Sequence, residues 1–125
     1  MTEMILSLDD ALKVYGTGAY LITTDARTPH TSRVNVTPHK EGLSFEIGKT
    51  AARNACNQAA ASLLWPPVEK TGYDLIVNGT VELLPSHNQG ATKALLRLSK
   101  AVLHRPGQAT DPESSCAADC QPLRF

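Results

Sequence analysis

The sequence predicts a mainly β protein, a small six-stranded antiparallel β-barrel with one N-terminal helix and one helix inserted between strands. Short segments alternate between apolar and polar residues every second position, and turn residues separate them. Two other segments have helical spacing instead. The 125 residues suffice for one domain, and a closed barrel leaves no exposed sheet edge. A Greek-key sandwich is the alternative fold for the same strands.

The first element is predicted to be a helix over residues 8–15. Ser7 is a suitable N-cap, and Asp10 follows it by three residues, as in a capping box. Gly16 suits the position that ends a helix. The apolar residues with helical spacing are Leu8, Ala11, Leu12 and Tyr15.

Six strands follow, at residues 18–24, 30–38, 43–47, 61–65, 73–84 and 95–104. Gly79 indicates a β-bulge within the fifth strand. The second strand is polar on one face only, because Val34 and Val36 alternate with Arg33, Asn35 and Thr37. That polar face is predicted to line a ligand site, although a solvated face of an ordinary antiparallel strand would show the same pattern.

The inserted helix has the features of an anion-binding site at its start. Gly48 permits a tight turn after the third strand, Thr50 is the predicted N-cap, and a helix is expected over residues 51–61. Unpaired N–H groups give a helix start partial positive charge, and Lys49 and Arg53 add two full charges. The pattern favours a phosphate, with two solvated surface cations as the alternative.

The Gly48-Lys49-Thr50 sequence does not belong to a nucleotide triphosphate loop. That motif requires a glycine at the position of Leu43, and residues 43–47 have the pattern of a strand. A triphosphate hydrolase is therefore excluded.

The net charge and the hydropathy of the chain limit the partners and the location that can be expected for it. Twelve basic and twelve acidic residues cancel, so no nucleic-acid partner is expected. No apolar stretch could span a bilayer, and the first residues lack the pattern of a secretion signal, so a cytoplasmic protein is expected. We expect the domain to cover residues 1–107 and a polar C-terminal tail to cover residues 108–125.

No metal site and no catalytic residue can be assigned from the sequence. Cys56 is predicted to be buried in the inserted helix, and Cys116 and Cys120 in the tail have no neighbouring histidine at zinc-binding spacing. We therefore expect the two tail cysteines to be dispensable. No Ser/His/Asp motif is present.

The order of these elements resembles the pyridoxamine 5'-phosphate oxidase-like family of FMN-binding split barrels. The resemblance rests on residues 18–24, Val34-Asn35-Val36, residues 49–54, Ser62-Leu63-Leu64-Trp65 and residues 77–81. It implies a homodimer with FMN at the interface. The cofactor-binding residues that it implies are Arg33, Val34, Asn35, Val36, Thr37, Lys49, Thr50, Arg53 and Asn54.

The chain differs from the family pattern at two points. Many relatives carry a lysine at about the position of Ala51, so Lys49 or Arg53 would have to contact the phosphate here. The chain also looks too short for the C-terminal region of the oxidase proper. The resemblance therefore implies an oxidoreductase that passes hydride or electrons between a reduced flavin and an unknown small molecule. The alternative is a non-catalytic module that binds FMN, a deazaflavin coenzyme or haem for storage or sensing.

Overall fold

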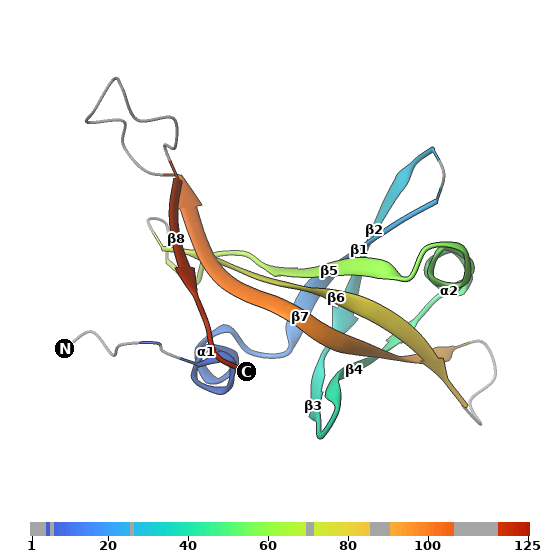
Figure 1. Cartoon of the computed structure of the whole chain (residues 1–125), viewed down its shortest axis with the longest axis horizontal. Coiled ribbons are helices and arrows are strands. Elements are labelled where there is room, and N and C mark those ends of the chain that lie inside the picture. The colour runs from blue at the N-terminus through green and yellow to red at the C-terminus, as the bar shows by residue number, and fades with distance from the viewer. Residues whose placement is uncertain (1–4, 6, 26, 70–71, 86–90, 107–117) are drawn as a thin grey trace.

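The computed structural model describes residues 5, 7–25, 27–69, 72–85, 91–106 and 118–125. It confirms the mainly β fold with two helices (Figure 1). In chain order, the elements are α1 (Leu8–Tyr15), β1 (Gly18–Thr24), β2 (Pro29–Asn35), β3 (Thr37–His39), β4 (Gly42–Ile47), α2 (Lys49–Asn57), β5 (Ala60–Trp65), β6 (Asp74–Leu84), β7 (Thr92–Pro106) and β8 (Ala118–Pro122).

The described strands form one curled antiparallel sheet. Their order is β2-β1-β5-β6-β7-β4-β3, and β8 pairs with β7. β2 and β3 lie at opposite ends of this order, yet Val36 alone separates them in the chain. The sheet must therefore curve until its two ends meet at Val36, as a split barrel requires. A sandwich of two separate sheets is excluded for these strands.

The described residues form eight strands, where six were predicted. The predicted strand over residues 30–38 breaks at Val36, because residues on either side pair with different partners, β1 and β4. The last predicted strand is longer than expected and covers Thr92–Pro106. The described part of the tail adds β8, and Leu123 behind it is buried. Residues 107–117, including Cys116, lie outside the described residues.

The two helices differ in how well they were predicted. α1 has the predicted bounds, and the Ser7 hydroxyl accepts a hydrogen bond from the Asp10 N–H at 3.2 Å. For α2 the predicted cap and end were wrong. Gly48, in extended conformation, is the N-cap without any side-chain hydrogen bond, and the helix ends at Asn57. Neither helix, at eight and nine residues, is long enough to cross a membrane.

The core fills the inside of the curved sheet, and α1 packs against it through Leu8 and Ala11. Trp65 is fully buried, and its indole N–H donates to the Gly16 carbonyl at 3.0 Å. This bond ties β5 to the end of α1. Cys56 is exposed, so its predicted burial was wrong; it lies on the outer side of α2, whereas Ala51 and Ala55 face the core.

Two glycines allow neighbouring strands to approach β7 closely. Gly42 has a φ of 153°, and a Cβ there would overlap with the Leu96 carbonyl oxygen. A Cβ on Gly79 would overlap with the carbonyl oxygen of Arg97. The register between β6 and β7 shifts at Asn78/Gly79, which confirms the predicted bulge.

We expect Gly79→Ala to destabilise the fold by about 2–3 kcal/mol, because the new methyl group meets backbone that cannot move freely. Gly48→Ala is the matched control, since no atom lies within 4 Å of its Cβ position. The control should cost less than about 1 kcal/mol, as for a modest loss at an N-cap. Urea unfolding of both variants measures the difference, and equal losses would contradict the close approach at Gly79.

The Tyr15 phenol provides a pH-dependent test of the contact between α1 and Tyr73, the residue that precedes β6. Its O–H donates to the Tyr73 carbonyl at 2.6 Å, and burial, followed by the negative charge of Asp74, raises its pKa. An unfolded tyrosine ionises near pH 10, before the folded one, so this contribution to stability is present below pH 10 and is lost as the pH rises above it. Tyr15→Phe should cost about 1 kcal/mol at pH 8 and should reduce this loss. Urea unfolding at pH 8 and 10.5 compares the two proteins; an unchanged pH dependence would contradict the assignment.

Candidate functional site

A polar groove runs along the place where the two ends of the sheet meet. It has a volume of about 430 Å³ and receives residues from the ends of β2 and β3, from β4 and from β7. Its lining residues are Arg33, Val34, Asn35, Thr37, Ser44, Phe45, Glu46 and Lys93. We call this groove the seam groove.

The structure brings together four of the predicted site residues in the seam groove. Val34 and Val36 are buried, with 7% and 2% of their surface exposed, whereas the polar residues that alternate with them, Arg33, Asn35 and Thr37, are exposed. The predicted alternation of this segment is thus confirmed. Arg33, Val34, Asn35 and Thr37 line the groove, while Val36 lies beneath it in the core.

The Arg33 side chain lies flat against β1. Its guanidinium carbon is 5.3 Å from the centre of the Tyr20 ring, and a Cβ on Gly18 would lie only 2.7 Å from one of its nitrogens. Tyr20 is its direct partner across β1 and β2. The glycine and the tyrosine therefore give the guanidinium a defined place beside the groove.

Sequence reasoning missed three polar residues of the groove. Ser44 and Glu46 come from β4, and Lys93 is paired with Glu46 across β4 and β7. Ser44 is buried, and its hydroxyl donates to the Thr37 carbonyl at 3.3 Å. The alternation of apolar and polar residues over positions 43–47 could have identified Ser44 and Glu46 as site residues. Lys93 can be identified only when the pairing of β4 with β7 is known.

The predicted anion site at the start of α2 is exposed and adjoins β4. Lys49, Thr50 and Arg53 are exposed and are not among the residues that line the seam groove. Lys49 follows Glu46 of the groove by three residues, a reach of at most ~10 Å. No side chain caps the helix start and its first turn holds no acidic residue, so its free N–H groups make this end of the helix electropositive.

Arg53 also acts on the turn between β1 and β2. The Asp25 carboxylate accepts hydrogen bonds from the N–H groups of Arg27 and Thr28, both at 2.7 Å. These bonds, and more weakly the positive charge of Arg53, hold the pKa of Asp25 below its ordinary value.

Asn54 lies on the buried side of α2, away from the exposed helix start. It is 1% exposed, and its amide nitrogen donates to the Thr23 hydroxyl at 3.2 Å. Its Oδ1 has no hydrogen-bond partner among the described residues. The structure thus connects Asn54 to β1 beneath the helix.

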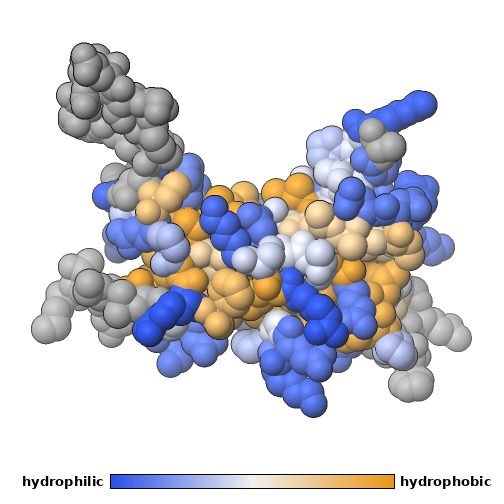
Figure 2. Space-filling view, in the orientation of Figure 1, coloured by the Kyte–Doolittle hydropathy of each residue, from blue (hydrophilic) through white to orange (hydrophobic). Residues whose placement is uncertain are grey.

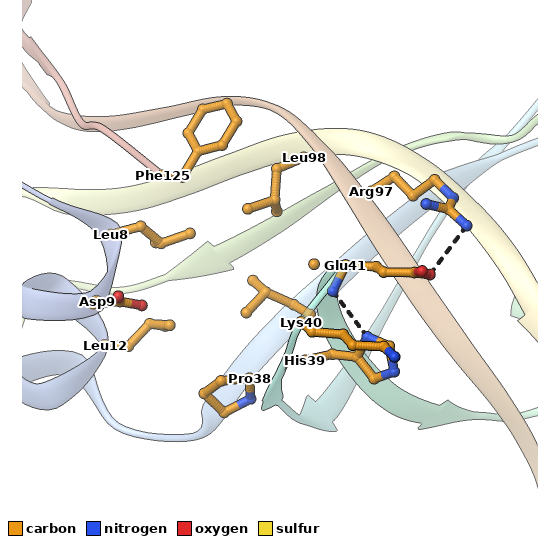
Figure 3. Close-up of a pocket in the computed structure, with 12 residues that line it drawn as sticks. Leu8, Asp9, Leu12, Pro38, His39, Lys40, Glu41, Arg97, Leu98 and Phe125 are labelled. Carbon is orange, nitrogen blue, oxygen red and sulfur yellow. Dashed lines mark hydrogen bonds and ion pairs between the residues drawn. The ribbon is translucent and has the colours of Figure 1, made fainter.

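A second groove lies between α1 and the hairpin of β3 and β4 (Figure 3). Its volume is about 360 Å³, and leucines from α1, β4 and β7 form much of its wall.

Across the described parts of the chain, no cluster of three His, Cys, Asp or Glu side chains could hold a metal ion.

The fold is shared with solved structures of low sequence identity. A predicted pyridoxamine 5'-phosphate oxidase from Listeria innocua is 11% identical, with a TM-score of 0.63 over 76% of this chain and 95% of that one. A pyridoxamine 5'-phosphate oxidase-related FMN-binding protein from Nostoc punctiforme gives 11% identity and a TM-score of 0.60 over 94% and 95% of the two chains. The haem storage protein HutZ from Vibrio cholerae is 14% identical, with a TM-score of 0.60 over 75% and 92%.

Sequence comparison identifies relatives but no function. No protein-family model matches the chain. Uncharacterized proteins from Mycobacterium bovis and Mycobacterium tuberculosis are each 30% identical to it over 80 residues, which cover 59% of this chain. The chain spans about half the length of these curated relatives, at 54% of each. The likeness to pyridoxamine 5'-phosphate oxidase-like proteins is therefore one of fold.

Proposed function

We propose that the protein binds FMN in the seam groove, with the phosphate directed toward the start of α2. One observation supports the proposal most directly. The polar residues of β2 and β3 line the same groove as Lys93, and this groove lies beside a helix start that has no side-chain cap. The FMN-binding protein from Nostoc punctiforme has the same fold. We propose the same cofactor for this chain, and the site proposed for it is our own assignment.

The groups present fit the polar parts of a flavin nucleotide. A phosphate needs cations and N–H donors, which Lys49, Arg53 and the first turn of α2 provide, with Arg33 and Lys93 in the groove. The remaining polar groups of the groove, from Asn35 and Thr37, offer hydrogen bonds to the ribityl chain or the ring.

The same groove is less suited to haem. Haem iron is usually held by His, Cys, Met or Tyr. None of these residue types is among the described residues that line the seam groove. We therefore favour a flavin over haem, and a deazaflavin coenzyme with its own phosphate remains compatible with the same contacts.

We propose that the protein acts as an oxidoreductase on a small molecule. Bound flavin would supply the hydride or electrons, and the chain would bind and orient the cofactor. Arg33 would hold negative charge, and the Val34–Thr37 segment would form one wall beside the ring. A non-catalytic flavin-binding module is the second candidate, because HutZ, which has the same fold, is a storage protein.

We also propose a homodimer, with the outer face of the sheet as the interface. Cross-strand pairing aligns one row of side chains across β1, β5, β6, β7 and β8, on the face opposite the core. The row consists of Tyr20, Leu64, Ile76, Val102 and Pro122. Hydrophobic surface is visible across the middle of the molecule in Figure 2. Because Arg33 stacks on Tyr20 and lines the groove, a partner on this row would lie next to the proposed cofactor site.

The cytoplasm is the proposed location. Three cysteines in 125 residues do not form the dense pattern of a disulfide-stabilised secreted domain. Free cysteines, such as Cys56 and Cys120, are typical of proteins in a reducing compartment.

The Lys49→Ala/Arg53→Ala variant should bind FMN about 2–4 kcal/mol more weakly than the unmodified protein, since each charge-assisted contact contributes about 1.5–2 kcal/mol. Fluorescence titration measures this loss. Binding of riboflavin, which lacks the phosphate, should be weak and similar in both proteins. Lys13→Ala/Lys100→Ala removes the same charge from exposed positions outside the seam groove and should leave FMN binding unchanged. FMN binding of equal strength in all three proteins would refute the phosphate site.

Arg33→Ala should lower the FMN bound per subunit while the melting temperature stays within a few degrees, because the side chain is exposed. Absorbance of the purified protein gives the occupancy, and a thermal scan gives the stability. Unchanged occupancy would identify an ordinary solvated strand, and a collapsed melting temperature would identify a structural arginine.

Light scattering at micromolar concentration should give about twice 13.4 kDa. Ile76→Glu should yield monomers, because it places a charge in the middle of the apolar row. Thr80→Glu is the matched control on the same strand and face, beyond the row, and should remain dimeric. A monomeric unmodified protein would contradict both the dimer and a shared cofactor site.

A further inference from the structure

We propose that the second groove, between α1 and the β3–β4 hairpin, binds small amphipathic carboxylates. The proposal rests on the coincidence of an apolar floor with a lysine and a histidine N–H donor at one end (Figure 3). It is independent of the proposed flavin site, and nothing in the comparisons assigns a ligand to this place.

The floor and one wall of the groove are apolar. Leu8 and Leu43 are buried beneath it, and Leu12 and Leu98 are half-buried along its sides. Phe125 closes the wall although 63% of its surface is exposed. An alkyl or aryl group in the groove would cover these side chains, which is favourable because apolar surface leaves water.

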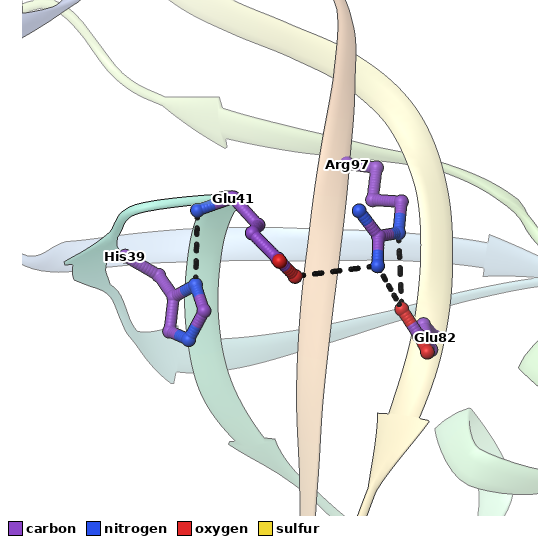
Figure 4. Close-up of polar contacts among 4 residues, drawn as sticks. All are labelled: His39, Glu41, Glu82 and Arg97. Carbon is purple, nitrogen blue, oxygen red and sulfur yellow. Dashed lines mark hydrogen bonds and ion pairs between the residues drawn. The ribbon is translucent and has the colours of Figure 1, made fainter.

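His39 presents a hydrogen-bond donor at the hairpin end. Its Nδ1 accepts a hydrogen bond from the Glu41 N–H at 3.0 Å (Figure 4). A nitrogen that accepts cannot carry the proton, so the neutral ring carries it on Nε2. The hairpin backbone thereby fixes the tautomer that offers an N–H to an acceptor such as a carboxylate oxygen.

Lys40 supplies the positive charge for such a ligand. The other cation of the groove, Arg97, is held by Glu41 at 3.3 Å and Glu82 at 2.8 Å (Figure 4). Neither of these two ion pairs of Arg97 uses Lys40. The remaining side-chain carboxylate of the groove, Asp9, lies on the α1 wall (Figure 3). A ligand is therefore expected to direct its carboxylate toward the hairpin and its apolar body toward Phe125.

The β3–β4 hairpin separates this groove from the seam groove. Thr37 and its partner Ser44 line the seam groove, whereas the next pair, Pro38 and Leu43, lines the α1 groove. Ligands of the two grooves would contact opposite faces of one hairpin. Carboxylate binding can therefore be measured whether or not FMN binds.

Octanoate and octan-1-ol are the probes, since they share an alkyl chain and differ in charge. In ¹H–¹⁵N NMR titrations of the full chain, octanoate should shift resonances of Leu8, His39, Leu98 and Phe125 and should bind at least fivefold more tightly than the alcohol. Lys40→Ala should reduce this ratio toward one. Lys100→Ala, an exposed lysine of β7 outside both grooves, should leave the ratio unchanged.

Phe125→Ala tests the apolar contact without disturbing the core, because the side chain is largely exposed. It should weaken octanoate and octanol by similar factors, at least threefold. Equal binding of acid and alcohol to the unmodified protein, a ratio unaffected by Lys40→Ala, or shifts that map outside the groove would each overturn the proposal. A finding that FMN does not bind would leave these results unaffected.

Discussion

Val36 joins two strands that occupy opposite ends of the sheet order, and this connection requires the sheet to close. Its N–H donates to the Thr17 carbonyl at 2.8 Å, which fixes the junction beside the start of β1. Closure needs curvature, and Gly42 and Gly79 provide it by letting β4 and β6 approach the backbone of β7. The seam groove is the space that remains where the two ends meet. Its position is therefore a result of the topology rather than of any single side chain.

Features that depend on neighbouring residues could be predicted from the sequence. α1 has an N-cap serine and a terminal glycine within one short segment, so its bounds were predictable. The burial of Val34 and Val36 follows from alternation, which an antiparallel strand imposes on its own residues. The bulge at Gly79 was predictable for a similar reason, because a glycine within an apolar strand already indicates that a neighbouring backbone approaches closely.

Features that depend on distant residues could not be predicted. Lys93 joins the groove through its register with Glu46, 47 positions earlier in the sequence, and no local pattern encodes that pairing. β8 forms in a polar segment because β7 offers it an edge. At α2 the local rule favoured Thr50 as the cap, but β4 ends at Ile47 and the chain turns directly into the helix at Gly48. The uncapped first turn that results is also what makes this helix start suitable for an anion.

The two ends of the described chain are neighbours in space. Ser7 and Arg124 form an isolated parallel bridge, and the Leu8 N–H donates to the Arg124 carbonyl at 2.7 Å. In Figure 1, the C-terminus lies beside α1. The topology is therefore suited to circular permutation, with Ser7 and Arg124 joined by a short linker and new ends created at Val36. Such a permutant would keep the strand pairs of the sheet but lose the covalent connection between β2 and β3. It would thus separate the contribution of strand pairing from that of closure, and it would make the seam groove an adjustable opening for protein engineering.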